Sequence, residues 1–168
     1  MTAEILALFP ADAIMVEHIV SRKEFASGGP WENEPDRIQW RDPKTNQMCL
    51  IRRNHYGALC GYVGVGSDHP WYNHAYDSID AKVHGGLTYG EHCDEDPIKG
   101  ICHVPKIGEA DHMFWLGFDC GHSSDFIPDS RFNSFSKGKY RSMQYVRDEC
   151  AKLALQASYA KGFNLDEI

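Results

Sequence analysis

The residues best suited to chemistry are histidines and aspartates in two separate segments of the chain. Asp119, His122 and Asp125 directly follow the apolar run at residues 115–118, so the rigid end of a strand is expected to position them. Histidine titrates near neutral pH, and an adjacent carboxylate can orient its ring and raise its basicity. The pattern therefore indicates an acid–base site, and a polar loop with turn-capping aspartates is the alternative.

The second segment contains His84, followed by Gly85 and Gly86 and, two positions later, Thr88. Two glycines after a histidine let the backbone approach a ligand closely. In a regular strand His84 and Thr88 would share a face, and a bulge at the glycines would break that relation. If this segment pairs with the strand before Asp119, both histidine-containing segments should face one pocket. We therefore expect these two glycines and the threonine to bind ligand.

The four side chains predict a small hydrolase in either of two forms. His84 and His122 can act as acid and base, or they can join Asp119 and Asp125 around a divalent metal ion that activates water. Two residues on the neighbouring strands are further candidates for ligand binding. Arg53 could meet a phosphate or carboxylate, and Tyr62 could stack on a planar ligand. A solvated strand end and core packing are the respective alternatives.

Cysteines raise two further questions. Cys120 lies beside Asp119, whose charge raises rather than lowers a thiol pKa, so a structural thiol is favoured over a nucleophile. Four residues that flank an acidic loop are candidate ligands of a structural zinc ion: His92, Cys93, Cys102 and His103. Thiolates and imidazoles suit zinc. In a reducing compartment zinc is favoured over a disulfide between the two cysteines.

Composition indicates a folded domain of 168 residues, 42% of them hydrophobic. The formal net charge of −7 argues against general nucleic-acid binding, because phosphate contacts need surplus lysine and arginine. No segment approaches the roughly 18 apolar residues that a membrane span needs. The first residues also lack the basic region of a signal peptide. We therefore expect a cytoplasmic protein without a membrane partner.

The apolar pattern predicts an α+β fold, with a mostly antiparallel sheet of about four strands and a C-terminal helix packed on one face. Strands are expected at residues 48–53, 59–65, 79–89 and 112–119. The first two strands form a hairpin, and the last, being the most apolar, is expected inside the sheet. A helix is expected over 140–159, where apolar residues recur every three or four positions.

The N-terminal region is predicted to form a helical segment over residues 4–26, broken near Pro10. It would serve as a cap or as a contact in a homo-oligomer. The expected organisation is therefore a helical extension at 1–30 and a single α+β domain at 31–168.

Several segments together resemble a group of small bacteriophage and prophage proteins without an agreed activity. The resemblance covers residues 31–157 and is most specific at HGGLT (84–88) and GFDCGHSSD (117–125). It implies a phage origin, a location in the cytosol of the bacterial host, and a site at the positions of His84, Asp119, His122 and Asp125. The Cys120 position varies more within the group.

Three functions remain in view. The first is a phage accessory protein, in a counter-defence role, that hydrolyses a small, nucleotide-like substrate. The second is a non-catalytic protein that sequesters a nucleotide-derived signal, although the predicted motifs lack the arginines and lysines that such a ligand calls for. The third is an inhibitor that binds a host protein through the acidic residues of 91–111.

Overall fold

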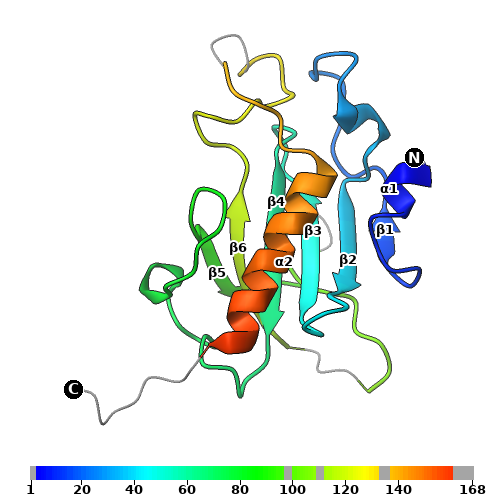
Figure 1. The fold of residues 1–168 in the computed structure, drawn as a ribbon. Helices are drawn as coiled ribbons and strands as arrows, with labels where there is room; N and C mark the ends of the chain where they lie inside the picture. Colours follow the sequence, from blue (N-terminus) through cyan, green and yellow to red (C-terminus); the bar gives the residue numbers. More distant parts are fainter. Residues whose placement is uncertain (1–2, 97–99, 109–111, 133–136, 161–168) are drawn as a thin grey trace.

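The structure is a computed structural model that describes residues 3–96, 100–108, 112–132 and 137–160. A six-stranded antiparallel sheet is crossed on one face by a long helix (Figure 1). In spatial order the strands are β1 (Ile14–Val16), β2 (Arg37–Arg41), β3 (Met48–Arg53), β4 (Leu59–Val65), β6 (Phe114–Asp119) and β5 (Tyr89–His92). The helices are α1 (Ala3–Leu6) and α2 (Met143–Tyr159), with 3₁₀ turns at Pro30–Asn33 and Tyr76–Ser78. The α+β class is confirmed, with six strands instead of about four.

The predicted hairpin is formed by β3 and β4, and its loop is stabilised by Asn54. The side-chain oxygen of Asn54 accepts hydrogen bonds from the amides of Tyr56 and Ala58, both at 3.1 Å. Gly57 adopts a φ of 94°, a left-handed conformation that only glycine adopts without strain. Local turn chemistry therefore sets the register of these two strands.

Both faces of the sheet are covered. Along β6 the side chains alternate, so that Leu116 and Phe118 join the core beneath α2 while Trp115 joins a second cluster on the opposite face. β6 lies between β4 and β5. Its position inside the sheet, predicted from its apolar composition, is confirmed.

Residues 100–104 run along the second face and are held there by β2. Arg37 donates to the carbonyl of Cys102 at 2.5 Å, and Gln39 exchanges hydrogen bonds of 2.7 and 2.9 Å with the backbone of Val104. These bonds satisfy polar backbone groups that would otherwise lie against apolar surface.

α2 is the predicted C-terminal helix, and it begins at Met143. Two of its first amide groups have side-chain acceptors: Ser142 Oγ accepts from Tyr145 N at 3.3 Å, and Glu34 Oε2 accepts from Met143 N at 2.6 Å. The helix therefore starts where a distant glutamate meets it. Its buried face includes the apolar stripe seen in the sequence: Met143, Val146, Cys150, Leu153 and Ala157.

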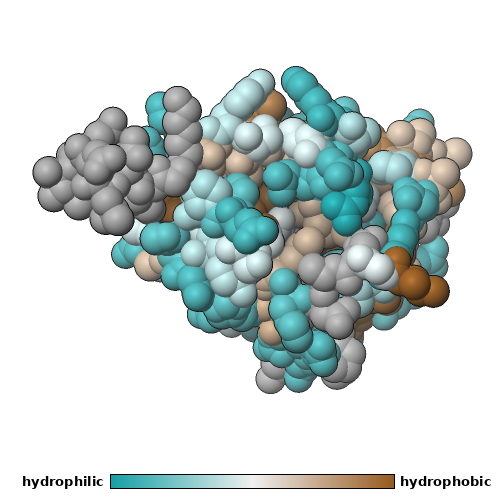
Figure 2. Space-filling model, turned by 90° about the horizontal axis from the view of Figure 1, so that it is seen from below, coloured by the Kyte–Doolittle hydropathy of each residue, from teal (hydrophilic) through white to brown (hydrophobic). Residues whose placement is uncertain are grey.

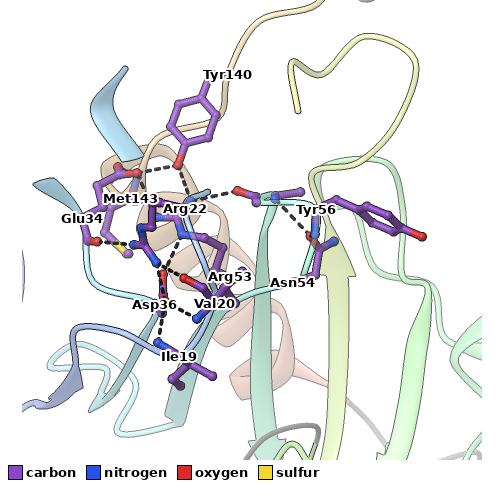
Figure 3. A network of polar contacts seen from close by, with 12 residues as sticks. Ile19, Val20, Arg22, Glu34, Asp36, Arg53, Asn54, Tyr56, Tyr140 and Met143 are labelled. Carbon is purple, nitrogen blue, oxygen red and sulfur yellow. Dashed lines mark hydrogen bonds and ion pairs between the residues drawn. The ribbon is translucent and has the colours of Figure 1, made fainter. Parts of the chain in front are cut away.

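A network of charged groups lies inside the protein around Arg53 (Figure 3). Arg53 Nε donates to Asp36 Oδ1 at 2.9 Å, and Nη2 lies 3.3 Å from Glu34 Oε1. Nη1 donates to the Tyr140 hydroxyl and to the Gly57 carbonyl, both at 2.8 Å. The Arg53 side chain is fully buried, so the prediction that it binds a ligand is wrong. Burial beside two carboxylates makes it a structural residue.

The prediction of a helical segment over residues 4–26 is wrong beyond α1. Residues 14–16 form β1, which pairs with β2 in the register Ile14↔Gln39 and Val16↔Arg37. The backbone groups at the outer edge of β2 need partners, and β1 supplies them. Phe9 packs edge-on against Trp40, with ring centroids 4.9 Å apart. This region therefore adds an edge strand and a core residue to the same sheet.

Exposed apolar side chains are spread over several elements. Seen from below in Figure 2, hydrophilic and hydrophobic residues are intermixed. Val104 and Ile107 are among the exposed apolar residues. In the described part of the chain, no helix has the length and apolar character needed to cross a membrane.

Candidate functional site

The candidate site is built around the imidazole of His84, which connects two distant parts of the chain. His84 Nε2 lies 2.9 Å from Asp125 Oδ2, and His84 Nδ1 lies 2.8 Å from the Tyr145 hydroxyl. A carboxylate only accepts hydrogen bonds, so Nε2 carries the proton in the neutral ring, and Nδ1 then accepts the hydroxyl proton of Tyr145. Asp125, His84 and Tyr145 thus form a continuous chain of hydrogen bonds.

The Asp125 carboxylate is fully buried and is held from several sides. Arg141 Nε donates to Oδ1 at 2.8 Å, and the His122 amide donates to Oδ2 at 3.0 Å. Burial opposes ionisation, but the hydrogen bonds from His84, Arg141 and the His122 amide outweigh it and hold the pKa of Asp125 below its usual value. Asp125 is therefore ionised at neutral pH, and as an acceptor for Nε2 it orients His84.

His122 lies beside His84, with ring centroids 5.9 Å apart. His122 Nε2 is buried, forms no hydrogen bond, and lies 3.5 Å from Asp119 Oδ1. The side chain as a whole is 34% exposed, so the rest of the ring is open to solvent. The two histidines are therefore neighbours, and their use as one site stays a prediction.

The loop that presents His84 is a glycine turn. Residues 79–88 were expected to be part of a strand, but regular pairing begins only at Tyr89. Gly85 and Gly86 have φ values of 67° and 78°, and Gly86 N donates to Val83 O at 2.8 Å. The strand prediction is wrong here because consecutive left-handed residues turn the chain out of a sheet.

Gly85 is also required by the neighbouring histidine. A Cβ atom at this position would lie 2.1 Å from His122 Nε2, whereas a Cβ at Gly86 would meet no atom within 4 Å. This difference gives a matched pair of variants.

We expect Gly85→Ala to displace His122 and to destabilise the fold by roughly 1–2 kcal/mol, the cost of a left-handed alanine. Gly86→Ala should carry the same backbone strain and leave His122 in place. Urea unfolding measures the loss of stability, and the NMR shifts of the histidine rings measure the displacement of His122. Equal displacement of His122 in the two variants would show that the close contact at Gly85 does not position this ring.

Asp119 and Thr88 form the outer part of the site. Thr88 Oγ1 donates to Asp119 Oδ2 at 3.0 Å, and the Gly121 amide donates to Asp119 Oδ1 at 2.9 Å. Thr88 is exposed and Asp119 is half-exposed. The four predicted catalytic residues and the predicted Thr88 are therefore close together at the end of β6.

Tyr62 does not belong to this group. It is 8% exposed and lies in the cluster on the face of the sheet away from α2, with its ring 5.2 Å from that of Tyr89 in an edge-on contact. The ligand-stacking role predicted for Tyr62 is therefore replaced by core packing.

Cys120 is a buried free thiol, 2% exposed. Burial, and then the charge of Asp125, raise its pKa. A thiol that stays protonated is a poor nucleophile, so the structural interpretation of Cys120 agrees with the geometry.

The predicted zinc site is not formed. Cys93 and Cys102 are joined in a disulfide, so their sulfurs bond to each other. The ring of His92 is hydrogen-bonded to Asn73, and the buried ring of His103 packs against Trp115. The disulfide closes a short loop and stabilises the fold by roughly 2–3 kcal/mol in the chain-entropy account.

The structure adds two residues that were not among the predicted site residues, Tyr145 and Arg141. The guanidinium carbon of Arg141 lies 5.0 Å from the centroid of the Tyr145 ring, and both line a cavity of about 270 Å³ together with Lys139. Burial, with a contribution from Glu149, raises the pKa of Tyr145. Their spacing of four residues was a weak signal, since such pairs are common near helix starts.

The prediction of a metal-dependent hydrolase requires side chains grouped around one metal ion. Among the described residues, no three side chains of His, Cys, Asp or Glu are grouped so that they could hold one metal ion. Asp125 instead accepts its bonds from Arg141, His84 and the backbone. The arrangement fits proton transfer better than metal coordination.

Comparison with known proteins identifies no family for this chain. No family model matches the chain, and no curated protein or solved structure is significantly similar to it.

Proposed function

We propose that the protein is a small hydrolase in which His84 acts as general base and Asp125 as its orienting carboxylate. The observation that supports this most is the hydrogen-bond chain from Asp125 through His84 to the hydroxyl of Tyr145, a residue that also lines a cavity. An imidazole with a carboxylate on one nitrogen and a hydroxyl on the other is arranged to accept a proton from that hydroxyl.

In the proposed step, the Tyr145 hydroxyl relays a proton from a water molecule to His84. The water gives a proton to the tyrosine oxygen while the tyrosine proton passes to His84 Nδ1, and the remaining hydroxide attacks the substrate. The imidazolium that forms lies against the Asp125 carboxylate, whose lowered pKa keeps it ionised at neutral pH, and this charge stabilises the imidazolium. The raised pKa of Tyr145 favours this relay role, because the side chain stays protonated between turnovers.

Cations outnumber acids at the cavity, which supports an anionic substrate. Arg141, which is also paired with Asp125, and Lys139 line it together with one acid, Asp148, and guanidinium and ammonium groups bind phosphate and carboxylate oxygens. This supports a small, phosphate-bearing and therefore nucleotide-like substrate. His122 and Asp119, at the outer side of the site, are the proposed second acid–base pair.

The test is turnover of a panel of chromogenic phosphate monoesters, phosphate diesters and carboxylic esters, together with nucleotides followed by chromatography. We expect activity on the phosphate compounds, reduced by about 10²–10⁴-fold in His84→Asn, because a general base contributes on that order. His18→Asn, at an exposed histidine, is the matched control and should retain full activity.

Two results would contradict the hydrolase. One is wild-type protein that leaves the whole panel unchanged, and the other is equal turnover by wild type and His84→Asn. Recovery of a nucleotide bound but unaltered would favour sequestration instead. The counter-defence role remains a prediction. Residues 97–99 and 109–111 of the acidic segment proposed to bind a host protein lie outside the described residues.

A further inference from the structure

A disulfide joins the edge strand β5 to residues 100–104, which lie on the second face of the sheet. One of its sulfurs belongs to Cys93, which directly follows β5, and the other to Cys102. Residues 100–104 are also fixed to β2, because Arg37 donates to the carbonyl of Cys102 and the Gln39 side chain bonds to the backbone two residues later. Three strands, β3, β4 and β6, separate β2 from β5. The disulfide therefore completes a connection between one edge of the sheet and a strand near the other edge.

β5 is a short strand at the edge of the sheet. It has four residues, and within the described part of the chain it pairs with β6 alone. Short edge strands open more readily than interior ones. At the end of β5 the amide of Cys93 donates to Met113 O at 3.0 Å, and the ring of His92 bonds to Asn73. The disulfide adds a covalent bond at the same point, so it fixes the end of a strand that is otherwise held by noncovalent contacts.

The acidic residues around Cys93 oppose closure of the loop that the disulfide makes. Residues 91–96 contain four acids and neither lysine nor arginine, and like charges this close together repel each other. Backbone hydrogen bonds act against the repulsion, such as the one of 3.2 Å from Asp94 N to Ile101 O. Without the covalent bond, the repulsion would favour an open loop.

The two sulfur-bearing residues differ in exposure. Cys102 is 8% exposed, whereas Cys93 is half-buried, so a thiol from solution is expected to reach the disulfide at Cys93. The other four cysteines are buried free thiols: Cys49, Cys60, Cys120 and Cys150. Burial raises the pKa of each of them. Because only a thiolate attacks a disulfide, these four thiols are poor exchange partners.

We propose that this disulfide is a redox-reactive site, and that its reduction by a dithiol releases the end of β5 while residues 100–104 stay on β2. One thiolate of the dithiol bonds to the Cys93 sulfur, and the sulfur–sulfur bond of the protein breaks, leaving its electron pair on Cys102, which takes up a proton. The second thiolate of the dithiol then displaces Cys93, which is protonated in turn, and the reductant leaves as a cyclic disulfide. Two electrons have passed from the dithiol to the protein.

The first test is the rate at which dithiothreitol reduces the native full-length protein, followed by alkylation and mass spectrometry. We expect a rate proportional to the dithiothreitol concentration and unchanged by urea below the unfolding transition, because the half-buried Cys93 is reached without global unfolding. A rate that rises at least about fivefold per molar urea would follow the unfolded population. That result would make the disulfide a purely structural bond and would overturn the proposal.

The second test is ¹⁵N NMR relaxation of the oxidised and the reduced protein. On reduction the backbone order parameters of Glu91, His92 and Cys93 should fall from about 0.85 to below about 0.6, the range of flexible chain. Those of Val104, held by Gln39, and of Val146 in α2 should not change. Unchanged values at residues 91–93, or an equal fall at Val104, would contradict the release of β5.

Two cysteine variants show whether the effect arises at this disulfide. Cys93→Ser should have the order parameters of the reduced protein without any reductant, and dithiothreitol should change nothing further in it. Cys60→Ser removes one of the buried free thiols and should respond to dithiothreitol as the wild type does. A response of Cys93→Ser equal to that of the wild type would overturn the proposal. His84→Asn should also respond like the wild type, because this site does not depend on the proposed hydrolase.

Discussion

Replacing Arg53 by methionine should lower the free energy of unfolding by about 3–5 kcal/mol, the usual cost of removing one partner of a buried ion pair. Methionine has a similar volume but leaves Asp36 and Glu34 buried without the guanidinium that now lies between them. The Tyr140 hydroxyl also loses a donor. Urea denaturation followed by tryptophan fluorescence measures the change.

Lys44→Met is the control for Arg53→Met, because it replaces an exposed cation and should change stability by no more than about 0.5 kcal/mol. If the two variants unfold at the same urea concentration, the buried network around Arg53 contributes little net stability to the fold.

The same network predicts the response of the wild type to acid. Burial opposes ionisation of Asp36, but the hydrogen bonds from Arg22 and from the amides of Val20 and Ile19 outweigh it and lower its pKa. A carboxyl group whose pKa is lowered by folding stabilises the fold fully above the ordinary value of 3.8, and this stability is lost as the pH falls below it. The free energy of unfolding of the wild type should therefore decrease as the pH falls below 3.8. The decrease should be smaller in Asp36→Asn, which has lost this carboxylate and is already less stable at neutral pH.

The second large effect is expected for Asp125→Asn, which should reduce turnover by about 10²–10⁴-fold. The carboxylate now accepts hydrogen bonds from Arg141, His84 and the His122 amide. The side-chain amide of asparagine has only one acceptor oxygen, and its NH₂ group takes the place of the other oxygen. That NH₂ group then either faces one of the present donors or makes His84 Nε2 an acceptor, which moves the His84 proton to Nδ1. With a proton on Nδ1, His84 can no longer accept one from Tyr145.

Long-range ¹H–¹⁵N NMR of the imidazole distinguishes this account from a general loss of structure. We expect the Nε2-protonated form of His84 in the wild type and the Nδ1-protonated form in Asp125→Asn. Asp77→Asn, at an exposed aspartate, makes the same charge change and should leave both turnover and tautomer as they are. An unchanged tautomer in Asp125→Asn would show that Asp125 does not orient His84.

Elements whose signals are local could be predicted from the sequence. Runs of β-type residues on either side of Asn54 and Gly57 identified β3 and β4, and spacings of three and four identified α2. The N-terminal region was misread because its apolar spacing is only partly helical. What places Ile14–Val16 in the sheet is pairing with β2, which is a long-range contact with no local signature.

The disulfide illustrates the same limit. The sequence marked Cys93 and Cys102 as belonging together, but spacing alone could not separate zinc binding from a sulfur–sulfur bond. The structure decides because the two cysteines lie 4.7 Å apart at their Cα atoms, within the range that a disulfide spans, while the nearby histidines have other partners.

The sequence by itself determined which residues of the candidate site are polar and chemically capable. His84 precedes two glycines, whereas Asp119, His122 and Asp125 lie at or just after a strand end, and residue type alone marks all four. Only the tertiary structure decided how they are used. It placed Tyr145, 61 residues from His84 along the chain, on the free nitrogen of that ring, and it buried Arg53 with two carboxylates. The physical reason is that the proton position on an imidazole and the role of an arginine depend on the groups that surround them. Those groups are brought together by the packing of α2 on the sheet.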